Sequence, residues 1–192
     1  MTAKSSVFER SDAKLLKGVT LWFTGLPSSG KSTVARLVER QFRKWGLKVE
    51  LLDGDVVRTN LSKGLSFSRE DRDLNIKRIG FVCQLLTRNG VIAIASAISP
   101  YREIRDYNRR MIGSFVEIYV KTSAEECEKR DVKGLYKKAR AGEIQGFTGV
   151  DDPYEEPLHP EVLCETEKES VEESAAKVIA RIEELGYIQL KA

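Results

Sequence analysis

The sequence predicts an α/β fold of three layers, in which a parallel sheet of five strands is covered by helices on both faces. Short apolar segments alternate along the chain with longer segments whose apolar residues recur at helical spacing, which is typical of repeated strand–helix–strand units. The segment 91–95 is almost wholly apolar, as expected of a central parallel strand that is buried on both faces. Ligands of such sheets bind outside the carboxyl ends of the strands, so the segments that follow strands are the first candidates for a functional site.

Each element is assigned from local signals. We expect strands at 19–24, 48–52, 91–95, 114–120 and 187–190. We expect helices at about 34–45, 68–88, 101–111, 124–130 and 170–185, and a short one near 12–16. Ser68 with Asp71, and Ser170 with Glu173, have the spacing of N-terminal helix caps. Gly46 is expected to end the first long helix.

The chain is expected to form one domain, since 192 residues suffice for one hydrophobic core. Residues 1–18 are polar and are expected to form an N-terminal arm, followed by the domain itself at 19–192. Within the domain, the stretch of about 131–160 is punctuated by glycines and is first basic, then acidic. A loop of this length is either functional or disordered, and we interpret this one as a lid.

Composition excludes several classes of function. The chain is 41% hydrophobic and 32% charged, which is typical of a soluble globular protein. Its formal net charge of +3 gives no case for general affinity to nucleic acid or membrane. No apolar segment approaches the roughly 20 residues that cross a bilayer, and the N-terminus lacks the apolar region of a signal peptide. The separated cysteines Cys83, Cys127 and Cys164 are expected to be reduced thiols in a cytoplasmic protein, with a redox-regulatory pair as the alternative.

A phosphate-binding loop follows the first long strand. Residues 25–33 fit the pattern G-x-x-x-x-G-K-[ST], with a strand before them and a helix after them. Backbone N–H groups of such a loop surround phosphate, Lys31 is expected to reach the outer phosphates of a nucleoside triphosphate, and Ser32 is expected to hold Mg²⁺. The alternative, a Gly/Ser-rich turn that binds nothing, is disfavoured by this context. The candidate residues for binding this triphosphate are Gly25, Leu26, Pro27, Ser28, Ser29, Gly30, Lys31, Ser32 and Thr33.

Carboxylates and arginines follow the second strand. Asp53 and Asp55 are candidates to hold a metal-bound water or to accept a proton from the acceptor hydroxyl, and we favour Asp55 because it lies further from the sheet. Arg58, Arg72 and Asn75 are expected near the same rim. An arginine fork binds two oxygens of phosphate or sulfate at once. These residues therefore predict a kinase for a small anionic acceptor.

The remaining polar segments lie in the second half of the chain. The basic segment 133–140 is expected to open the lid, which would exclude water from the transfer. Phe147 is a candidate to stack on a nucleotide base, with ordinary packing as the alternative. The acidic residues from Asp151 onward are assigned to a solvated return segment, and His159 is given no catalytic role. Four arginines of the helix at 101–111 are mostly assigned to the surface, namely Arg102, Arg105, Arg109 and Arg110.

Five separated motifs lie in order along the chain. They are Leu52-Asp53-Gly54-Asp55-x-x-Arg58, Phe67-Ser68-x-Glu70-Asp71-Arg72-x-x-Asn75, Ile98-Ser99-Pro100-Tyr101-Arg102, Lys133-Gly134-Leu135-Tyr136 and Phe147-Thr148-Gly149-Val150-Asp151-Asp152-Pro153-Tyr154. Together they resemble adenylylsulfate kinase (APS kinase), a P-loop kinase family. The likeness runs from about residue 17 to 187, nearly the whole chain.

The resemblance implies transfer of the γ-phosphoryl group of ATP, bound with Mg²⁺, to the 3′-hydroxyl of adenosine 5′-phosphosulfate (APS), a step of sulfate activation. It implies that Asp55 is the catalytic or Mg²⁺-organising carboxylate and that Arg58, Arg72 and Asn75 hold the phosphosulfate. It also implies a homodimer and a functional link to ATP sulfurylase. The other residues that it assigns are Ile98 and Ser99 in the substrate site, Phe147 over the substrate adenine, Lys133 and Lys137 as lid cations, and Arg130 near the adenine of ATP.

Three positions need comment. Ser99 matches the serine described in this family as a phosphoserine intermediate, but a P-loop site is arranged for direct in-line transfer and nothing marks a base to activate Ser99. We therefore expect Ser99 to hydrogen-bond the substrate. Pro27 replaces the serine that is usual in the family's loop and has no N–H to offer a phosphate, so we expect altered affinity. Ala97 replaces the usual aromatic residue and is expected to loosen the acceptor pocket.

Two other functions stay open at this point. A catalytically silent nucleotide-sensing domain of the same fold should have lost Lys31, Ser32 or Asp55, and all three are present. A P-loop kinase for another small acceptor, such as a sugar acid or a nucleoside, is disfavoured by the motif at 147–154.

Overall fold

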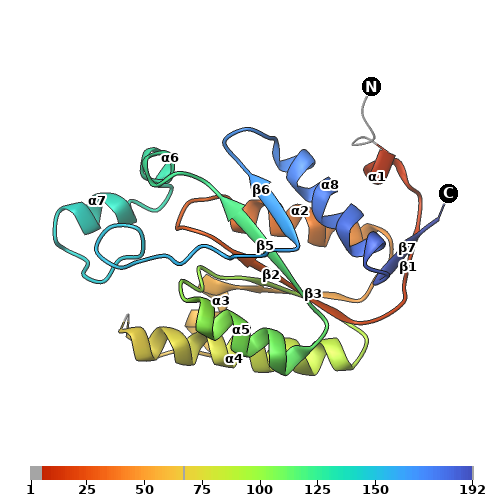
Figure 1. Ribbon diagram of the computed structural model, residues 1–192, viewed down its shortest axis with the longest axis horizontal. Helices are drawn as coiled ribbons and strands as arrows, with labels where there is room; N and C mark the ends of the chain where they lie inside the picture. The colour runs from red at the N-terminus through yellow and green to blue at the C-terminus, as the bar shows by residue number, and fades with distance from the viewer. Residues whose placement is uncertain (1–5, 67, 192) are drawn as a thin grey trace.

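The computed structural model describes residues 6–66 and 68–191, which form a parallel sheet between two layers of helices (Figure 1). The five strands of this sheet lie in the order β3–β4–β2–β5–β6, and each neighbouring pair is parallel. They are β2 (Val19–Thr24), β3 (Val49–Asp53), β4 (Ile92–Ser96), β5 (Phe115–Lys121) and β6 (Val162–Glu165). The predicted fold class is confirmed.

Helices cover both faces of the sheet (Figure 1). Helices α2 (Lys31–Lys44) and α8 (Val171–Glu184) cover one face, and α4 (Arg69–Arg88) and α5 (Arg102–Ile112) cover the other. The shorter helices are α1 (Ser6–Glu9), α3 (Gly54–Asn60), α6 (Ala124–Arg130) and α7 (Leu135–Arg140). The expected caps form: Ser68 Oγ accepts a hydrogen bond from Asp71 N at 3.2 Å, and Ser170 and Glu173 make a complete capping box.

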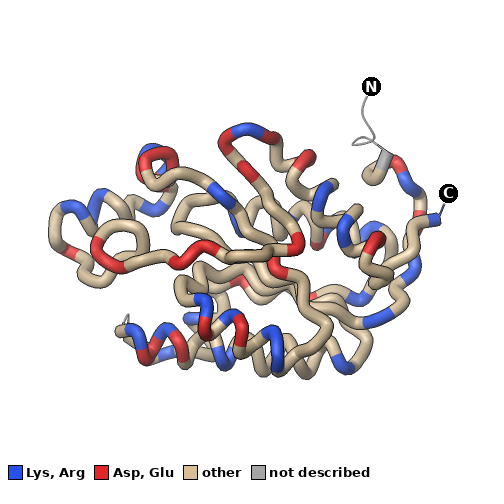
Figure 2. Tube along the Cα trace, in the orientation of Figure 1, with Lys and Arg blue, Asp and Glu red and all other residues tan. Residues whose placement is uncertain are grey.

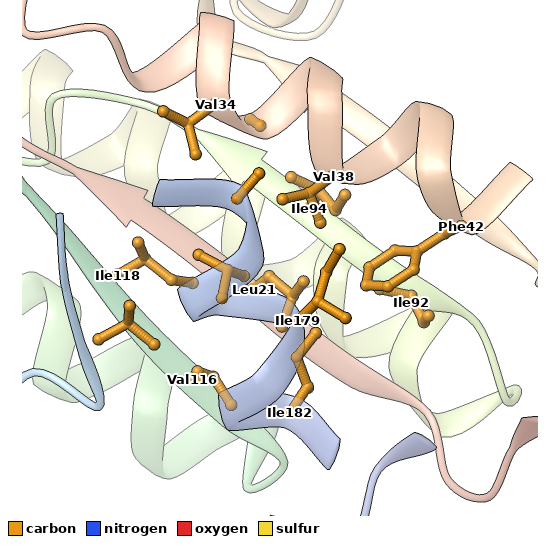
Figure 3. Close-up of a cluster of buried hydrophobic side chains, with 14 of the residues drawn as sticks. Leu21, Val34, Val38, Phe42, Ile92, Ile94, Val116, Ile118, Ile179 and Ile182 are labelled. Carbon is orange, nitrogen blue, oxygen red and sulfur yellow. The ribbon is translucent and has the colours of Figure 1, made fainter. Parts of the chain in front are cut away.

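Each face of the sheet has its own hydrophobic core, because successive side chains of a strand point to opposite faces. Leu21 of β2 packs against α2 and α8 together with Ile94 and Ile118 (Figure 3). Trp22, the next residue of β2, is fully buried on the α4 and α5 side. Its neighbour across the strands is Ala95, whose small side chain leaves room for the indole. Burying a large apolar side chain stabilises the fold by about 1.5–3 kcal/mol.

Two expectations about the ends of the chain are wrong. The fifth strand of the parallel sheet is β6, and not the segment 187–190. That segment contains β7 (Ile188–Leu190), which pairs antiparallel with β1 (Ala13–Leu15) in a separate two-stranded sheet. Residues 12–16 therefore contain a strand where a short helix was expected. Both segments are short, and their conformation is decided by pairing with a partner at the other end of the chain, which local preference cannot reveal.

The stretch expected to be the lid extends beyond the carboxyl end of β5 and contains α7 (Figure 1). Figure 2 shows basic residues on α7 and acidic residues along the segment that returns to the sheet. A small core joins the lid to α6: Tyr136, Ala139 and Phe147 of the lid pack with Cys127 of α6. Within the described part of the chain, no helix combines the length and the apolar character that crossing a bilayer requires.

The three cysteines are unpaired and buried. Burial raises the pKa of all three thiols, that of Cys164 to about 12. Because the reactive form of cysteine is the thiolate, these side chains behave as small apolar core residues at neutral pH.

Candidate active site

Three segments that are far apart in the sequence meet at the carboxyl ends of β2, β3 and β4. The phosphate-binding loop follows β2, Asp53 ends β3, and Ser96 ends β4. Ser96 pairs in register with Phe23 on one side and with Asp53 on the other. The three strand ends are therefore level, and the groups that follow them share one rim of the sheet.

The phosphate-binding loop folds around its own lysine. Lys31 is 8% exposed, and its Nζ donates a hydrogen bond to the Leu26 carbonyl at 2.6 Å. Gly25 and Gly30 have φ angles of 152° and 98°, which residues with a side chain rarely adopt. A Cβ at Gly25 would also collide with the Val120 carbonyl. The backbone conformation at these two positions thus requires glycine. The Lys31 ammonium lies against the loop, next to the place where a phosphate would bind.

Residues outside the motif hold the loop from the side. Thr166 Oγ1 donates to the Ser29 carbonyl at 2.8 Å. Arg130 donates to Thr166 Oγ1 and to the Thr166 carbonyl, both at 3.0 Å, so Arg130 is fixed beside the loop. Thr166 follows β6 and belongs to none of the motifs recognised in the sequence, and only the fold reveals its position.

Oxygen donors suited to Mg²⁺ lie next to the loop. Ser32 Oγ is 3.1 Å from Ser96 Oγ, and the buried Asp53 carboxylate forms an ion pair of 3.1 Å with Arg36. Mg²⁺ prefers such hard oxygen ligands, and in nucleotide sites it takes one or two from the protein and others from phosphate and water. The backbone of Asp55 belongs to the first turn of α3, while its side chain lies outside the described part of the structure. Ser32 therefore lies beside other oxygen donors, and its role in holding Mg²⁺ stays a prediction.

Two of the expected acceptor-binding residues lie on neighbouring helices. Arg58 of α3 donates to the Ser66 carbonyl at 3.3 Å, and Ser66 Oγ donates to Asp71 at the start of α4 at 2.5 Å. Asn75 of α4 is 8% exposed, and its Oδ1 has no hydrogen-bond partner among the described residues. A buried amide oxygen is normally satisfied, so Asn75 points to a ligand that donates to it.

Arg72, the third expected acceptor residue, contacts the lid. Its guanidinium donates to the Gly146 carbonyl and, at 3.1 Å, to Thr148 Oγ1, and it forms an ion pair with Asp152. The Tyr101 hydroxyl donates to the same carboxylate at 3.0 Å. The assignment of Asp152 to a solvated return segment is therefore wrong, because that carboxylate is held by an arginine and a tyrosine from the opposite side of the site.

Ser99 lies in the segment after β4, which we call the acceptor loop (97–100). The Ser99 side chain is 1% exposed; its Oγ accepts a hydrogen bond from Trp22 Nε1 at 2.9 Å and donates to the Ala97 carbonyl at 3.1 Å. Its φ of 43° is unusual for a residue with a side chain. The carbonyl of Ile98 accepts from Thr24 Oγ1 at 2.6 Å. The hydroxyl of Ser99 is thus engaged within the protein, and its backbone is held in a strained conformation.

The other expected lid residues differ in their surroundings. Phe147 is 9% exposed and packs edge-on against Tyr136, with ring centroids 5.0 Å apart. The Tyr136 hydroxyl donates to the Pro27 carbonyl at 3.2 Å, so the lid touches the phosphate-binding loop at its atypical residue. Lys133 and Lys137 lie exposed at the start of the lid. The structure thus places Phe147 in the lid's small core, and the two lysines at its surface.

The arginines of α5 are a second correction. Arg105 is 2% exposed, Arg109 is partly buried in ion pairs with Glu117 and Glu161, and Arg102 donates to the Glu156 carbonyl at 2.7 Å. Positions 102, 105 and 109 are spaced by three and four residues, so they share one face of the helix. That spacing could have indicated a shared, partly buried face. It was overlooked because the four arginines, taken together, are spread around the whole helix. Only Arg110 of the four is exposed as expected.

A loop that surrounds phosphate, with a lid reaching across it, suits group transfer from a nucleoside triphosphate, so the fold and the site define a P-loop kinase. A model of the family described as adenylylsulphate kinase matches residues 17–165. The chain belongs to this family.

Individual relatives agree with the family match. The chain is 63% identical over 172 residues to the adenylyl-sulfate kinase of Picosynechococcus sp., covering 90% of this chain and 97% of that protein. The Mycobacterium tuberculosis APS kinase CysC, solved in complex with AMPPNP and APS, is 43% identical with a TM-score of 0.84, covering 87% of this chain and 98% of its own. A hexameric APS kinase from Thiobacillus denitrificans is 35% identical with a TM-score of 0.70, covering 96% of this chain and 31% of its own.

Proposed function

We propose that this protein transfers the γ-phosphoryl group of ATP to the 3′-hydroxyl of APS, giving 3′-phosphoadenylylsulfate and ADP. The observation that carries the proposal is the pairing of two anion sites at one rim. On one side stands the phosphate-binding loop with Lys31, and on the other stands the guanidinium of Arg72. Asn75 Oδ1, which is an acceptor, adds a place for a donor group of the second nucleotide. The 43% identical relative was solved with AMPPNP, which stands in for ATP, and with APS, and so supports the assignment of one nucleotide to each side.

The chain's own residues account for the main needs of the reaction. Lys31 neutralises the charge that develops on the transferred phosphoryl group, and the loop N–H groups hold the other phosphates. Ser32 would hold Mg²⁺, which would supply positive charge to offset that of the phosphates. Asp55, at the start of α3, would accept the proton of the acceptor hydroxyl. The lid covers the site so that water does not compete as acceptor.

Ser99 is better suited to positioning than to carrying the phosphoryl group. Its Oγ donates to the Ala97 carbonyl and accepts from Trp22, and the side chain is almost fully buried. A serine nucleophile needs a neighbouring base within hydrogen-bond reach, and neither of these two partners is a base. We therefore propose direct in-line transfer between the two nucleotides.

The proposal is tested by measuring ADP release in a coupled assay with APS as acceptor, compared with AMP, gluconate and shikimate. We expect turnover with APS and at most slow turnover with the other acceptors. The variant Lys31→Ala should lower kcat by about 100-fold or more, because one preorganised charge at the transition state is worth that much. Equal rates with gluconate or shikimate would favour the kinase for another small acceptor, and no turnover with any acceptor would favour the nucleotide-sensing domain.

The cellular setting is also proposed. APS must be supplied by an enzyme that joins ATP and sulfate, so we propose a functional link to ATP sulfurylase activity and a place in the cytoplasm, where ATP is available. We also propose a homodimer formed through α4 and α5. Their outer face carries a groove of about 310 Å³ lined by Leu61, Phe81 and Tyr107, which are 39%, 54% and 41% exposed. Exposed apolar side chains grouped in this way are typical of contact surfaces, and one relative is a hexamer.

A further inference from the structure

Arg105 of α5 is the least exposed charged side chain among the described residues, and the reaction proposed above gives it no role. It is 2% exposed. Its three nitrogens donate three hydrogen bonds: Nε to Glu117 Oε1 at 2.8 Å, Nη1 to the Ser99 carbonyl at 2.5 Å and Nη2 to the Glu155 carbonyl at 2.6 Å. A buried guanidinium is costly unless its charge and its N–H groups are satisfied, so this arrangement asks for an explanation.

The three partners of Arg105 come from three different parts of the site. Ser99 belongs to the acceptor loop, Glu155 lies at the end of the segment that returns from the lid, and Glu117 is on β5, an interior strand of the sheet. Two of the partners are backbone carbonyls. A hydrogen bond to a backbone carbonyl restrains the backbone at that residue. Through these bonds Arg105 connects the acceptor loop and the end of the lid to Glu117 of β5.

Independent contacts hold the same two segments together. Glu155 N donates to the Pro100 carbonyl at 2.8 Å. Thr24 Oγ1 donates to the Ile98 carbonyl at 2.6 Å and lies 2.9 Å from the Tyr154 hydroxyl. Because Thr24 Oγ1 gives its own proton to the Ile98 carbonyl, the Tyr154 hydroxyl is the donor in its contact with Thr24. The lid end therefore lies along the acceptor loop, with Arg105 beneath both.

We propose that Arg105 is a positioning residue that holds the acceptor loop in the conformation required for substrate and couples this loop to the end of the lid. The proposal rests on the function proposed above, since it assigns the acceptor site to the loop at 97–100. Ser99 has a φ of 43°, which is unfavourable for a residue with a side chain. Such a backbone conformation persists only where contacts with the surrounding protein stabilise it. The Arg105 hydrogen bond to the Ser99 carbonyl is the strongest such contact, because its donor is charged.

The neighbouring residue Arg109 supplies a matched control. Arg109 lies on the same helix and shares Glu117 with Arg105, at 3.3 Å, and its other partner is Glu161, at 2.5 Å. The hydrogen bonds described for Arg109 reach neither the acceptor loop nor the segment 154–156. Arg105→Lys and Arg109→Lys are therefore the same chemical change. Only the first is made at a residue that contacts the acceptor loop and the end of the lid.

The experiment compares both variants with the wild type in steady-state kinetics and in hydrogen–deuterium exchange of the protein without ligand. A lysine keeps the charge for Glu117 but cannot reach three acceptors as a fork does. For Arg105→Lys we expect a KM for APS about ten-fold higher, a lower kcat and a KM for ATP within about two-fold of the wild type, as loss of a charged hydrogen bond implies. We also expect faster exchange in segments 97–101 and 153–157. Arg109→Lys should stay close to the wild type in all of these measurements.

Three results would overturn the proposal. They are unchanged exchange in both segments of Arg105→Lys, an equal rise of the KM for APS and for ATP, or the same rise of the KM for APS in Arg109→Lys. If Arg105→Lys does not fold, Tyr154→Phe tests the same coupling, because it removes only the hydroxyl that reaches Thr24. It should raise the KM for APS by about two- to five-fold and speed exchange at 97–101, and no change in either would overturn the proposal. Exchange is measured without substrate, so it separates a failure of this inference from a failure of the proposed reaction.

Discussion

Arg72 and Asp152 form an ion pair that joins the start of α4 to the lid. Asp152 also accepts a hydrogen bond from Tyr101 at 3.0 Å, so the carboxylate is fixed from two sides. Arg72 is at the same time one of the residues proposed to hold the phosphosulfate. The guanidinium is therefore oriented by the protein before any ligand binds, which lowers the cost of ordering it on binding.

Asp152→Ala tests whether this orientation matters. We expect the KM for APS to rise about ten-fold, because a charged hydrogen bond that orients Arg72 is worth about 1.5–3 kcal/mol, while the KM for ATP changes little. Initial rates with each nucleotide varied in turn measure both constants.

Glu156→Ala is the matched control, since it removes an exposed carboxylate from the same return segment that pairs only with Lys121, at 3.6 Å, in the described ion pairs. An equal rise for both nucleotides in Asp152→Ala, or tighter binding of APS, would contradict the proposed role of the ion pair.

Ser99→Ala separates positioning from covalent catalysis. Because Ser99 Oγ is bound to Trp22 and to the Ala97 carbonyl, we expect kcat to fall by no more than about ten-fold, the value of one or two neutral hydrogen bonds. A phosphoserine intermediate would instead require loss of nearly all turnover. Single-turnover reactions with γ-³²P-labelled ATP give a second readout: label retained on wild-type protein would show that the direct mechanism is wrong.

The features predicted well from the sequence are those whose causes are local. The phosphate-binding loop is specified by glycines at positions with positive φ and by one lysine, all within nine consecutive residues. The caps of α4 and α8 likewise depend on side chains three residues apart. Such patterns carry their own geometry, so they can be recognised before any tertiary contact is known.

The features that were missed depend on distant partners. Arg105 is buried because residues 154–156 pack against α5, where their carbonyls accept hydrogen bonds from its arginines. No residue near position 105 in the sequence indicates this contact. Asp152 is held by Arg72, which lies 80 positions earlier in the chain. Phe147 packs on Tyr136 inside the lid, and such packing was the alternative left open to base stacking, which stays a prediction. Charge and burial at these positions follow from topology, which local patterns do not contain.

Pro27→Ser tests the atypical position of the phosphate-binding loop. Pro27 cannot donate a hydrogen bond, and its carbonyl accepts one from Tyr136 at 3.2 Å. Serine would restore a backbone N–H to the loop while leaving that carbonyl in place. We expect the KM for ATP to fall by about two- to ten-fold, the value of one added hydrogen bond, and the KM for APS to stay the same. Initial rates with ATP and APS varied in turn check both constants, and an unchanged or higher KM for ATP would show that residue 27 does not face the phosphates.

Phe81→Glu tests the proposed contact between two copies of the chain. Phe81 of α4 is 54% exposed and lines the groove between α4 and α5. In a two-fold interface each residue is used twice, so burying a carboxylate there would be penalised in both copies. We expect the dimer dissociation constant to rise by about 100-fold or more, measured by light scattering during size-exclusion chromatography. Leu185→Glu is the control, because Leu185 is 40% exposed at the end of α8 on the opposite face. A wild-type monomer, a dimer that survives Phe81→Glu, or a dimer lost equally in Leu185→Glu would each exclude this face as the interface.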